Sequence, residues 1–112
     1  MKDPYAVCRT AEKIRRDPFR SYDFHGIAEH NGISYDHFRR LFNEKHQMPP
    51  HEYIRNQRLF RAAELLRVTN MRIKEIVFTC GFDSMMEFSR SFKRYSGLSP
   101  RAYREKIRRE KG

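Results

Sequence analysis

The chain has 112 residues, with 24 Lys and Arg against 14 Asp and Glu and a formal net charge of +10. This length allows one domain or two small units that share a core, and the charge favours a polyanionic partner, most often nucleic acid. No apolar run is long enough to span a membrane, and no signal-peptide core follows Met1. The two distant cysteines, Cys8 and Cys80, fit neither a disulfide framework nor a zinc motif, so we expect a reducing, intracellular location and no cofactor or metal.

Residues 4–16 have the pattern of an amphipathic helix. Asp3-Pro4 is typical of an N-cap followed by a proline at the first helical position, and Asp17-Pro18 is typical of a helix end. The apolar stripe between them consists of Val7, Ala11 and Ile14. The basic residues of this helix should therefore face outward.

Two further helices follow, each with a candidate N-cap. Asp23 could cap a short helix that ends at Asn31-Gly32, although Gly26 inside it costs about 1 kcal/mol relative to alanine. Ser34 could cap the next helix, which we expect over 35–45. The apolar face of that helix consists of Phe38, Leu41 and Phe42.

The longest predicted helix occupies 49–68 and starts at Pro49-Pro50. Its broad apolar face consists of Tyr53, Ile54, Leu59, Ala62, Ala63, Leu65 and Leu66. At about 1.5 Å per residue, this helix would be roughly 27 Å long. We expect at least one of its arginines to pair with Glu52 or Glu64.

The last third of the chain predicts three more helices. A short one ends at Cys80-Gly81, Asp83 is a candidate N-cap for a helix over 84–95, and Gly97 ends that helix. Ser99-Pro100 then begins a final helix that runs to about Arg109. The apolar face of helix 84–95 consists of Phe88, Ser91, Phe92 and Tyr95. The predicted fold class is therefore all-α, with about seven helices.

An internal repeat organises these helices. The repeated pairs are Ile27 and Ile76, Gly32 and Gly81, Phe38 and Phe88, Arg40 and Arg90, Phe42 and Phe92, Pro50 and Pro100, and Tyr53 and Tyr103. Each copy is a short helix, a glycine turn, a capped helix and a proline-started helix, which is a helix-turn-helix motif. We predict a single domain over 1–112, in which helix-turn-helix units at 4–48 and 72–109 are joined by the linker helix 49–68.

The capped helix of each copy presents equivalent residues away from its apolar face. At about 100° per residue, they are Asp36, Arg40 and Asn43 in the first copy and Met86, Arg90 and Lys93 in the second. A helix fits the major groove of B-DNA, where arginine can bind guanine O6 and N7. Two such helices held about one helical turn (~34 Å) apart could read successive major grooves. The alternative for Arg40 and Arg90 is an intramolecular pair with Glu44 or Glu87.

Two segments resemble AraC/XylS transcription regulators. GFDSMMEFSRSFKRYSGLSPRAYR is similar to the C-terminal signature of that family, and IAEHNGISYDHFRRLFNEKHQMPPHEYIRNQRLFRAAELLR is similar to the upstream half of the same domain. The resemblance covers about residues 5–108. It implies two helix-turn-helix units on a long linker helix, and regulation of transcription, usually activation, through double-stranded DNA. Gln47 and Pro49 depart from the pattern, because a glycine and a small residue commonly end helix 34–45.

The resemblance also implies site residues and partners. The base-reading positions fall at Tyr35, Asp36, Arg39 and Arg40 and at Met85, Met86, Ser89 and Arg90. Candidate contacts to the DNA backbone are Ser34, His37, Asn43, Ser84, Lys93 and Arg94. The family further implies RNA polymerase as a partner, a bacterial cytoplasmic and nucleoid-associated location, and often an N-terminal effector domain, for which this chain has no room. We therefore expect the DNA-binding half of a longer protein rather than a short stand-alone regulator.

Other interpretations compete with this one. A basic architectural or RNA-binding module is the second hypothesis. An enzyme is the third, and neither cysteine resembles an activated nucleophile with a positioned base. The spacing of the repeated phenylalanines predicts core rather than stacking platforms, and the five histidines match no zinc pattern. The C-terminal cations could be a solvated tail or could attract phosphates; they are Arg104, Lys106, Arg108, Arg109 and Lys111.

Overall fold

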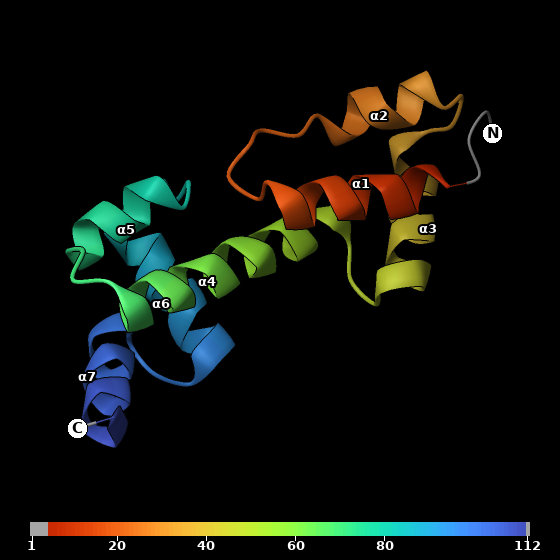
Figure 1. The fold of residues 1–112 in the computed structure, drawn as a ribbon. Helices are drawn as coiled ribbons and strands as arrows, with labels where there is room; N and C mark the ends of the chain where they lie inside the picture. The colour runs from red at the N-terminus through yellow and green to blue at the C-terminus, as the bar shows by residue number, and fades with distance from the viewer. Residues whose placement is uncertain (1–4, 112) are drawn as a thin grey trace. The chain divides into compact units, whose positions relative to one another are not determined.

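The computed structural model describes residues 5–111, which form seven α-helices and no strand. The helices are α1 (Ala6–Arg16), α2 (Phe24–His30), α3 (Tyr35–His46), α4 (Pro50–Val68), α5 (Ile73–Thr79), α6 (Met85–Ser96) and α7 (Pro100–Lys111). Figure 1 shows their order along the chain. The predicted all-α fold class is confirmed. No helix in the described part of the chain combines the length and apolar character needed to cross a membrane.

The helix bounds differ from the predicted ones mainly at the two ends of the chain. α1 begins at Ala6 rather than at residue 4, and the predicted start at Asp3-Pro4 lies outside the described residues. α7 continues to Lys111, past the predicted end near Arg109. α4 begins at Pro50, as its proline start predicts.

The chain divides into two compact units, Met1–Gln57 and Arg58–Gly112, called here the N-terminal unit and the C-terminal unit. The division falls inside α4, which is one continuous helix (Figure 1). Tyr53 and Ile54 of α4 belong to the core of the N-terminal unit, whereas Leu59 and Leu66 belong to the core of the C-terminal unit. One helix therefore supplies apolar surface to both units, as the apolar face of segment 49–68 predicts.

The core of the N-terminal unit is enclosed by α1, α2, α3 and the start of α4. It consists of Val7, Ala11, Ile14, Phe24, Ala28, Phe38, Phe42, Tyr53 and Ile54. Phe38 and Phe42 are completely buried, so each contributes about 1.5–3 kcal/mol through the hydrophobic effect. At the edge of this core, Arg15 donates a hydrogen bond of 2.7 Å to the hydroxyl of Tyr53.

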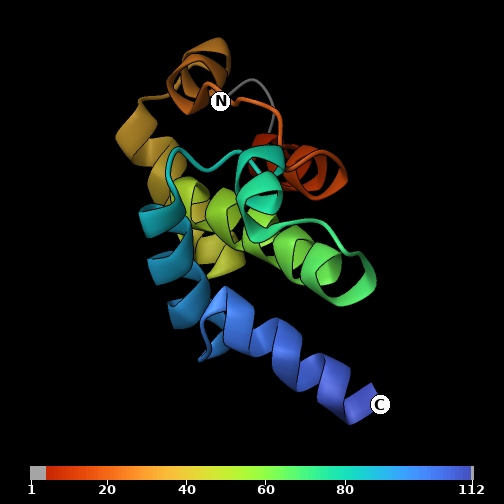
Figure 2. The same cartoon turned by 90° about the vertical axis from the view of Figure 1, so that its left-hand side faces the viewer.

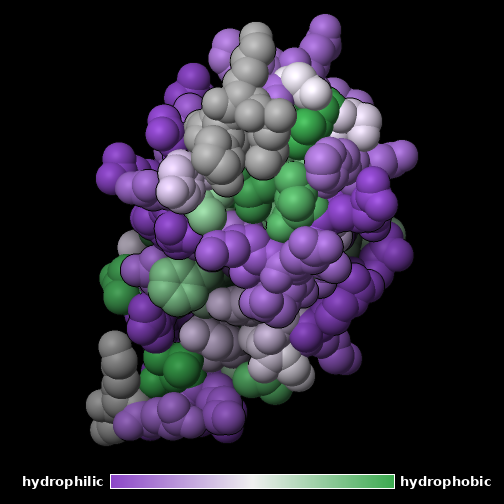
Figure 3. Space-filling view, turned by 90° about the vertical axis from the view of Figure 1, so that its right-hand side faces the viewer, coloured by the Kyte–Doolittle hydropathy of each residue, from purple (hydrophilic) through white to green (hydrophobic). Residues whose placement is uncertain are grey.

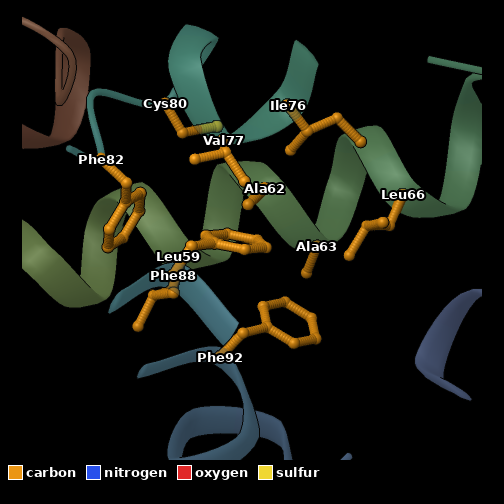
Figure 4. Packing of buried hydrophobic residues seen from close by; sticks show 10 residues of the cluster. All are labelled: Leu59, Ala62, Ala63, Leu66, Ile76, Val77, Cys80, Phe82, Phe88 and Phe92. Carbon is orange, nitrogen blue, oxygen red and sulfur yellow. The ribbon is translucent and has the colours of Figure 1, made fainter. Parts of the chain in front are cut away.

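The core of the C-terminal unit is built on α4. Figure 4 shows side chains of α5 and α6 pointing toward Leu59, Ala62, Ala63 and Leu66 of α4. Phe88 and Phe92 are completely buried, and Tyr103 of α7 packs edge-on against Phe92 at 5.2 Å between ring centroids. Tyr95, predicted on the same face, lies at the edge of the cluster: its side chain is 42% exposed, and its ring centroid lies 6.2 Å from that of Phe92.

The N-caps of α3 and α6 occupy equivalent repeat positions. The Ser34 hydroxyl accepts from the amide of His37, and the Ser84 hydroxyl accepts from the amide of Glu87, both at 3.1 Å. The predicted cap of the second helix, Asp83, is therefore wrong by one residue. Ser84 has the extended backbone that an N-cap needs, and its hydroxyl satisfies a free amide of the first turn.

The C-caps of the same two helices also match. Gln47 after α3 and Gly97 after α6 both have left-handed backbones, with φ of 62° and 85°. Their amides donate to the carbonyls of Asn43 and Lys93 at 2.8 and 2.7 Å. A glutamine thus adopts the conformation that the second copy gives to a glycine, and the departure at Gln47 does not change how the helix ends.

The turn between α6 and α7 redirects the chain, as the view in Figure 2 shows. The side chain of Arg104 in α7 contacts the end of α4 and the segment that follows it. Its guanidinium donates to three backbone carbonyls, those of Leu66 (3.0 Å), Met71 (2.7 Å) and Thr69 (3.2 Å). Burial, together with the nearby charge of Arg108, lowers the pKa of Arg104. Neither predicted role for the basic tail, solvation or phosphate attraction, fits Arg104, because carbonyls in the last turn of α4 and in the segment after it bind its guanidinium.

Two arginines of α4 and one cysteine after α5 also form defined contacts. Arg61 pairs with Glu64 at 3.8 Å, so one arginine of the linker helix forms the expected ion pair. Arg58, from the same helix, donates to the carbonyl of Gly81 at 3.4 Å. Cys80 is completely buried in the core.

Candidate nucleic-acid interface

The turns that precede α3 and α6 have the same backbone hydrogen bonds. In the first turn, the amides of Gly32 and Ile33 donate to the carbonyls of Glu29 and Ala28; in the second, the amides of Gly81 and Phe82 donate to those of Phe78 and Val77, all at 3.0–3.1 Å. Gly32 and Gly81 have φ of 73° and 79°, a region that favours glycine. The sequence repeat is therefore also a structural repeat, and each copy is a helix-turn-helix.

The outward face of α3 is determined by the burial of Phe38 and Phe42. With these side chains in the core, four predicted DNA-contacting residues are exposed: Asp36, Arg39, Arg40 and Asn43. His37 in the first turn is exposed as well. This face of α3 therefore combines two arginines with shorter polar side chains, and α3 buries only its opposite side.

The outward face of α6 has a different chemistry. Met86 is 69% exposed and Met85 is 41% exposed, although both are apolar. The basic residues Arg90, Lys93 and Arg94 are also exposed, whereas Ser89 is half-buried. Two adjacent methionines are thus exposed on the same helix as these basic residues.

Three predicted contact residues are already engaged within the protein. Ser34 and Ser84 use their hydroxyl oxygens as N-caps, so only the hydroxyl hydrogen of each remains as a donor. Tyr35, the first residue of α3, is half-buried, and its ring stacks on His25 of α2 with 4.0 Å between centroids and 18° between planes. No pattern in the sequence indicates this contact, because the repeat aligns His25 with Lys74.

Residues 5–111 contain neither a metal-binding cluster nor a reactive buried thiol that could form an alternative site. No group of three or more His, Cys, Asp or Glu that could hold a metal ion occurs within residues 5–111. Burial raises the pKa of the Cys80 thiol to about 11, which keeps it protonated at neutral pH. A hollow of about 710 Å³ lies beside α1 and α2, with Arg9, Lys13 and Arg20 in its lining. Figure 3 shows one face of the molecule, on which hydrophilic residues in purple surround smaller apolar patches in green.

Two turn-helix units, each with a serine-capped helix that exposes polar or basic residues, define a double helix-turn-helix protein. A family model described as "Helix-turn-helix domain" matches residues 27–106. The chain belongs to this family, which is of the AraC/XylS type. The predicted family is thus confirmed.

Individual relatives agree with this assignment. The chain is similar to the transcriptional activator AarP of Providencia stuartii, with 41% identity over 78 residues, 70% of this chain and 58% of AarP. It is also 41% identical to the F1 operon positive regulatory protein of Yersinia pestis over 78 residues, 70% of this chain and 26% of that protein. The chain therefore spans little more than half of the first relative and about a quarter of the second.

A solved structure matches nearly the whole chain. The DNA-binding domain of AdpA, a global transcriptional factor crystallised in complex with a target DNA, has a TM-score of 0.83 and 25% identity to this chain. The match covers 94% of this chain and 95% of the AdpA domain.

Proposed function

We propose that this chain is the DNA-binding part of a sequence-specific transcription regulator that acts as an activator. In this proposal, α3 and α6 enter successive major grooves of a duplex and contact base edges. The observation that carries it is the duplicated turn-helix unit, in which Arg40 and Arg90 occupy equivalent exposed positions. A guanidinium at such a position can donate two hydrogen bonds to guanine O6 and N7.

The two helices would read different sequences because their exposed side chains differ. On α3, Asp36 can accept a hydrogen bond from cytosine N4, and Arg39 adds a second guanidinium beside Arg40. On α6, Met85 and Met86 can contact the methyl group of thymine, and Ser89 takes the place of Arg39. The binding site should therefore be asymmetric, with no need for a second protein copy to provide a second reading helix.

Contacts to phosphates would position the two helices. Ser34 and Ser84 lie at the amino ends of α3 and α6, where free amides and the helix dipole favour an anion. The other proposed backbone contacts are His37, Asn43, Lys93 and Arg94. Together with the net charge of +10, these residues would supply the sequence-independent part of the affinity.

The partners follow from the same proposal. An activator bound at a promoter acts through RNA polymerase, and chromosomal DNA as a target places the protein in the bacterial cytoplasm at the nucleoid. AarP and the Yersinia protein are longer than the matched region. A further domain that binds an effector would suit such a regulator.

Selection of binding sites from random duplex DNA tests this function. We expect an enriched asymmetric site with two conserved segments about one helical turn apart, and an affinity that falls steeply with salt. Competition with structured RNA at one salt concentration is the second measurement. Equal affinity for the selected duplex, random duplexes and RNA would refute the proposal in favour of a basic architectural or RNA-binding module.

A further inference from the structure

The aromatic ring of Tyr35 contacts two histidines from different helices. It stacks on His25 of α2, with centroids 4.0 Å apart and planes 18° from parallel. His51 in the first turn of α4 meets it edge-on, at 6.1 Å and 61°. The first residue of α3 is thus held by the helix before it and by the helix after it.

This arrangement is anchored in the core of the N-terminal unit. His51 also packs edge-on against Phe24 of α2, with 5.0 Å between centroids and 89° between planes. Phe24 is only 3% exposed. His25 and His51 are both exposed, so the stack lies at the surface, and the buried Phe24 ring supports it through His51.

The stack restricts Tyr35 at a sensitive position. Tyr35 directly follows the N-cap Ser34, and the N-terminal residues of a recognition helix are the ones that contact base edges. A tyrosine side chain has only two rotatable bonds before its ring, so contacts with two other rings leave it little conformational freedom. Ordering before binding lowers the entropy that is lost when the complex forms.

We propose that His25 is a positioning residue for DNA recognition by α3: it fixes the ring of Tyr35, so that Tyr35 meets the duplex in one orientation. This inference rests on the proposed function, because it assigns to α2 a part in sequence reading through α3. His25 acts through Tyr35 and makes no base contact of its own. In the second copy of the repeat, Lys74 and Met85 replace His25 and Tyr35, so this stack is specific to the first reading helix.

The test uses the full chain and the duplex selected from random DNA as the probe. His25→Ala should weaken binding to this duplex about three- to tenfold, the size expected for one aromatic contact. The loss of base preference should be confined to the segment next to α3. His25→Phe keeps a flat ring and should restore affinity to within about twofold. His30→Ala, which removes an exposed histidine at the other end of α2, is the matched control and should change nothing.

A double-mutant cycle separates positioning from direct contact. Tyr35→Ala should cost as much as His25→Ala, and the double variant no more than Tyr35→Ala alone. In the DNA-free protein, Tyr35→Ala should also remove the ring-current shift of the His25 ring protons. Additive losses, or a His25→Phe variant as weak as His25→Ala, would overturn the inference, as would an unchanged affinity in His25→Ala. A wild-type chain that shows no preference among duplexes would instead refute the proposed function.

Discussion

Arg104→Met should destabilise the C-terminal unit measurably while preserving the aliphatic stem. The guanidinium of Arg104 donates to the carbonyls of Leu66, Thr69 and Met71. Leu66 lies in the last turn of α4, where carbonyls have no partner within the helix. A hydrogen bond from a charged donor contributes about 1.5–3 kcal/mol when buried. Arg104 is only half-buried, so water can replace part of each bond. We therefore expect a total loss of about 2 kcal/mol rather than three full contributions.

Urea denaturation followed by circular dichroism measures this loss. Arg108→Met is the matched control, because Arg108 lies one turn further along α7, is exposed, and donates one hydrogen bond of 2.8 Å to the side chain of Asn70. Its change should stay within about 0.5 kcal/mol. The loss of unfolding free energy for Arg104→Lys should lie between those for Arg104→Met and Arg108→Met, since an ammonium can reach fewer of the three carbonyls. A loss below about 0.5 kcal/mol for Arg104→Met would refute the reasoning that Arg104 holds the α4–α5 connection.

Three further predictions concern caps and the buried thiol. Ser84→Ala should cost about 1 kcal/mol in denaturation experiments and Asp83→Ala much less; the reverse order would restore the aspartate as the cap. Gln47→Gly should stabilise by about 0.5–1 kcal/mol because φ is 62°, whereas Gly97→Ala should destabilise by a similar amount at φ of 85°. Because burial raises the Cys80 pKa to about 11, the contribution of Cys80 to stability should be constant below pH 9 and fall between about pH 9 and 11, as the unfolded thiol ionises first. If a Cys80→Ala variant lost as much stability as the wild type between about pH 9 and 11, ionisation of Cys80 would not be the cause of the fall.

Most of the fold follows from local patterns in the sequence. The pairs Phe38 and Phe42 and Phe88 and Phe92 lie four residues apart, so helical geometry alone directs each pair into a core. The glycine turns follow in the same way, since only glycine adopts positive φ at little cost. The repeat then relates the two copies, and the exposed faces of the two reading helices follow from their buried faces.

Sequence patterns were insufficient where two local structures have similar free energy, and where a contact between residues distant in sequence determines the structure. Asp83 and Ser84 are adjacent and have similar intrinsic preference for an N-cap, so propensity could not choose between them. Tyr95 contacts Phe92 as its face predicts, but helical spacing could not show that Tyr103 of α7 contacts Phe92 as well. No periodicity could assign Arg104 to three carbonyls more than thirty residues away.

The sequence predicts which faces of α3 and α6 are exposed, but it does not predict the contacts that side chains of the site make within the protein. The exposed positions on α3 and α6 follow from helical spacing and from the resemblance to regulators. The stack between His25 and Tyr35 could not be predicted, because it joins residues ten positions apart on two helices whose angle the sequence does not specify. The role of each exposed side chain in DNA binding remains a prediction.

The central claim is that α3 and α6 are two separate reading helices. The most direct measurement compares the base preferences of the wild type with those of Arg40→Ala and Arg90→Ala, using one randomised duplex pool at one salt concentration. Each variant should bind the wild-type site about 1–3 kcal/mol more weakly while remaining folded, and each should lose base preference in a different segment, the two about one helical turn apart. Unchanged preferences in both variants, or loss of the same segment in both, would contradict the claim.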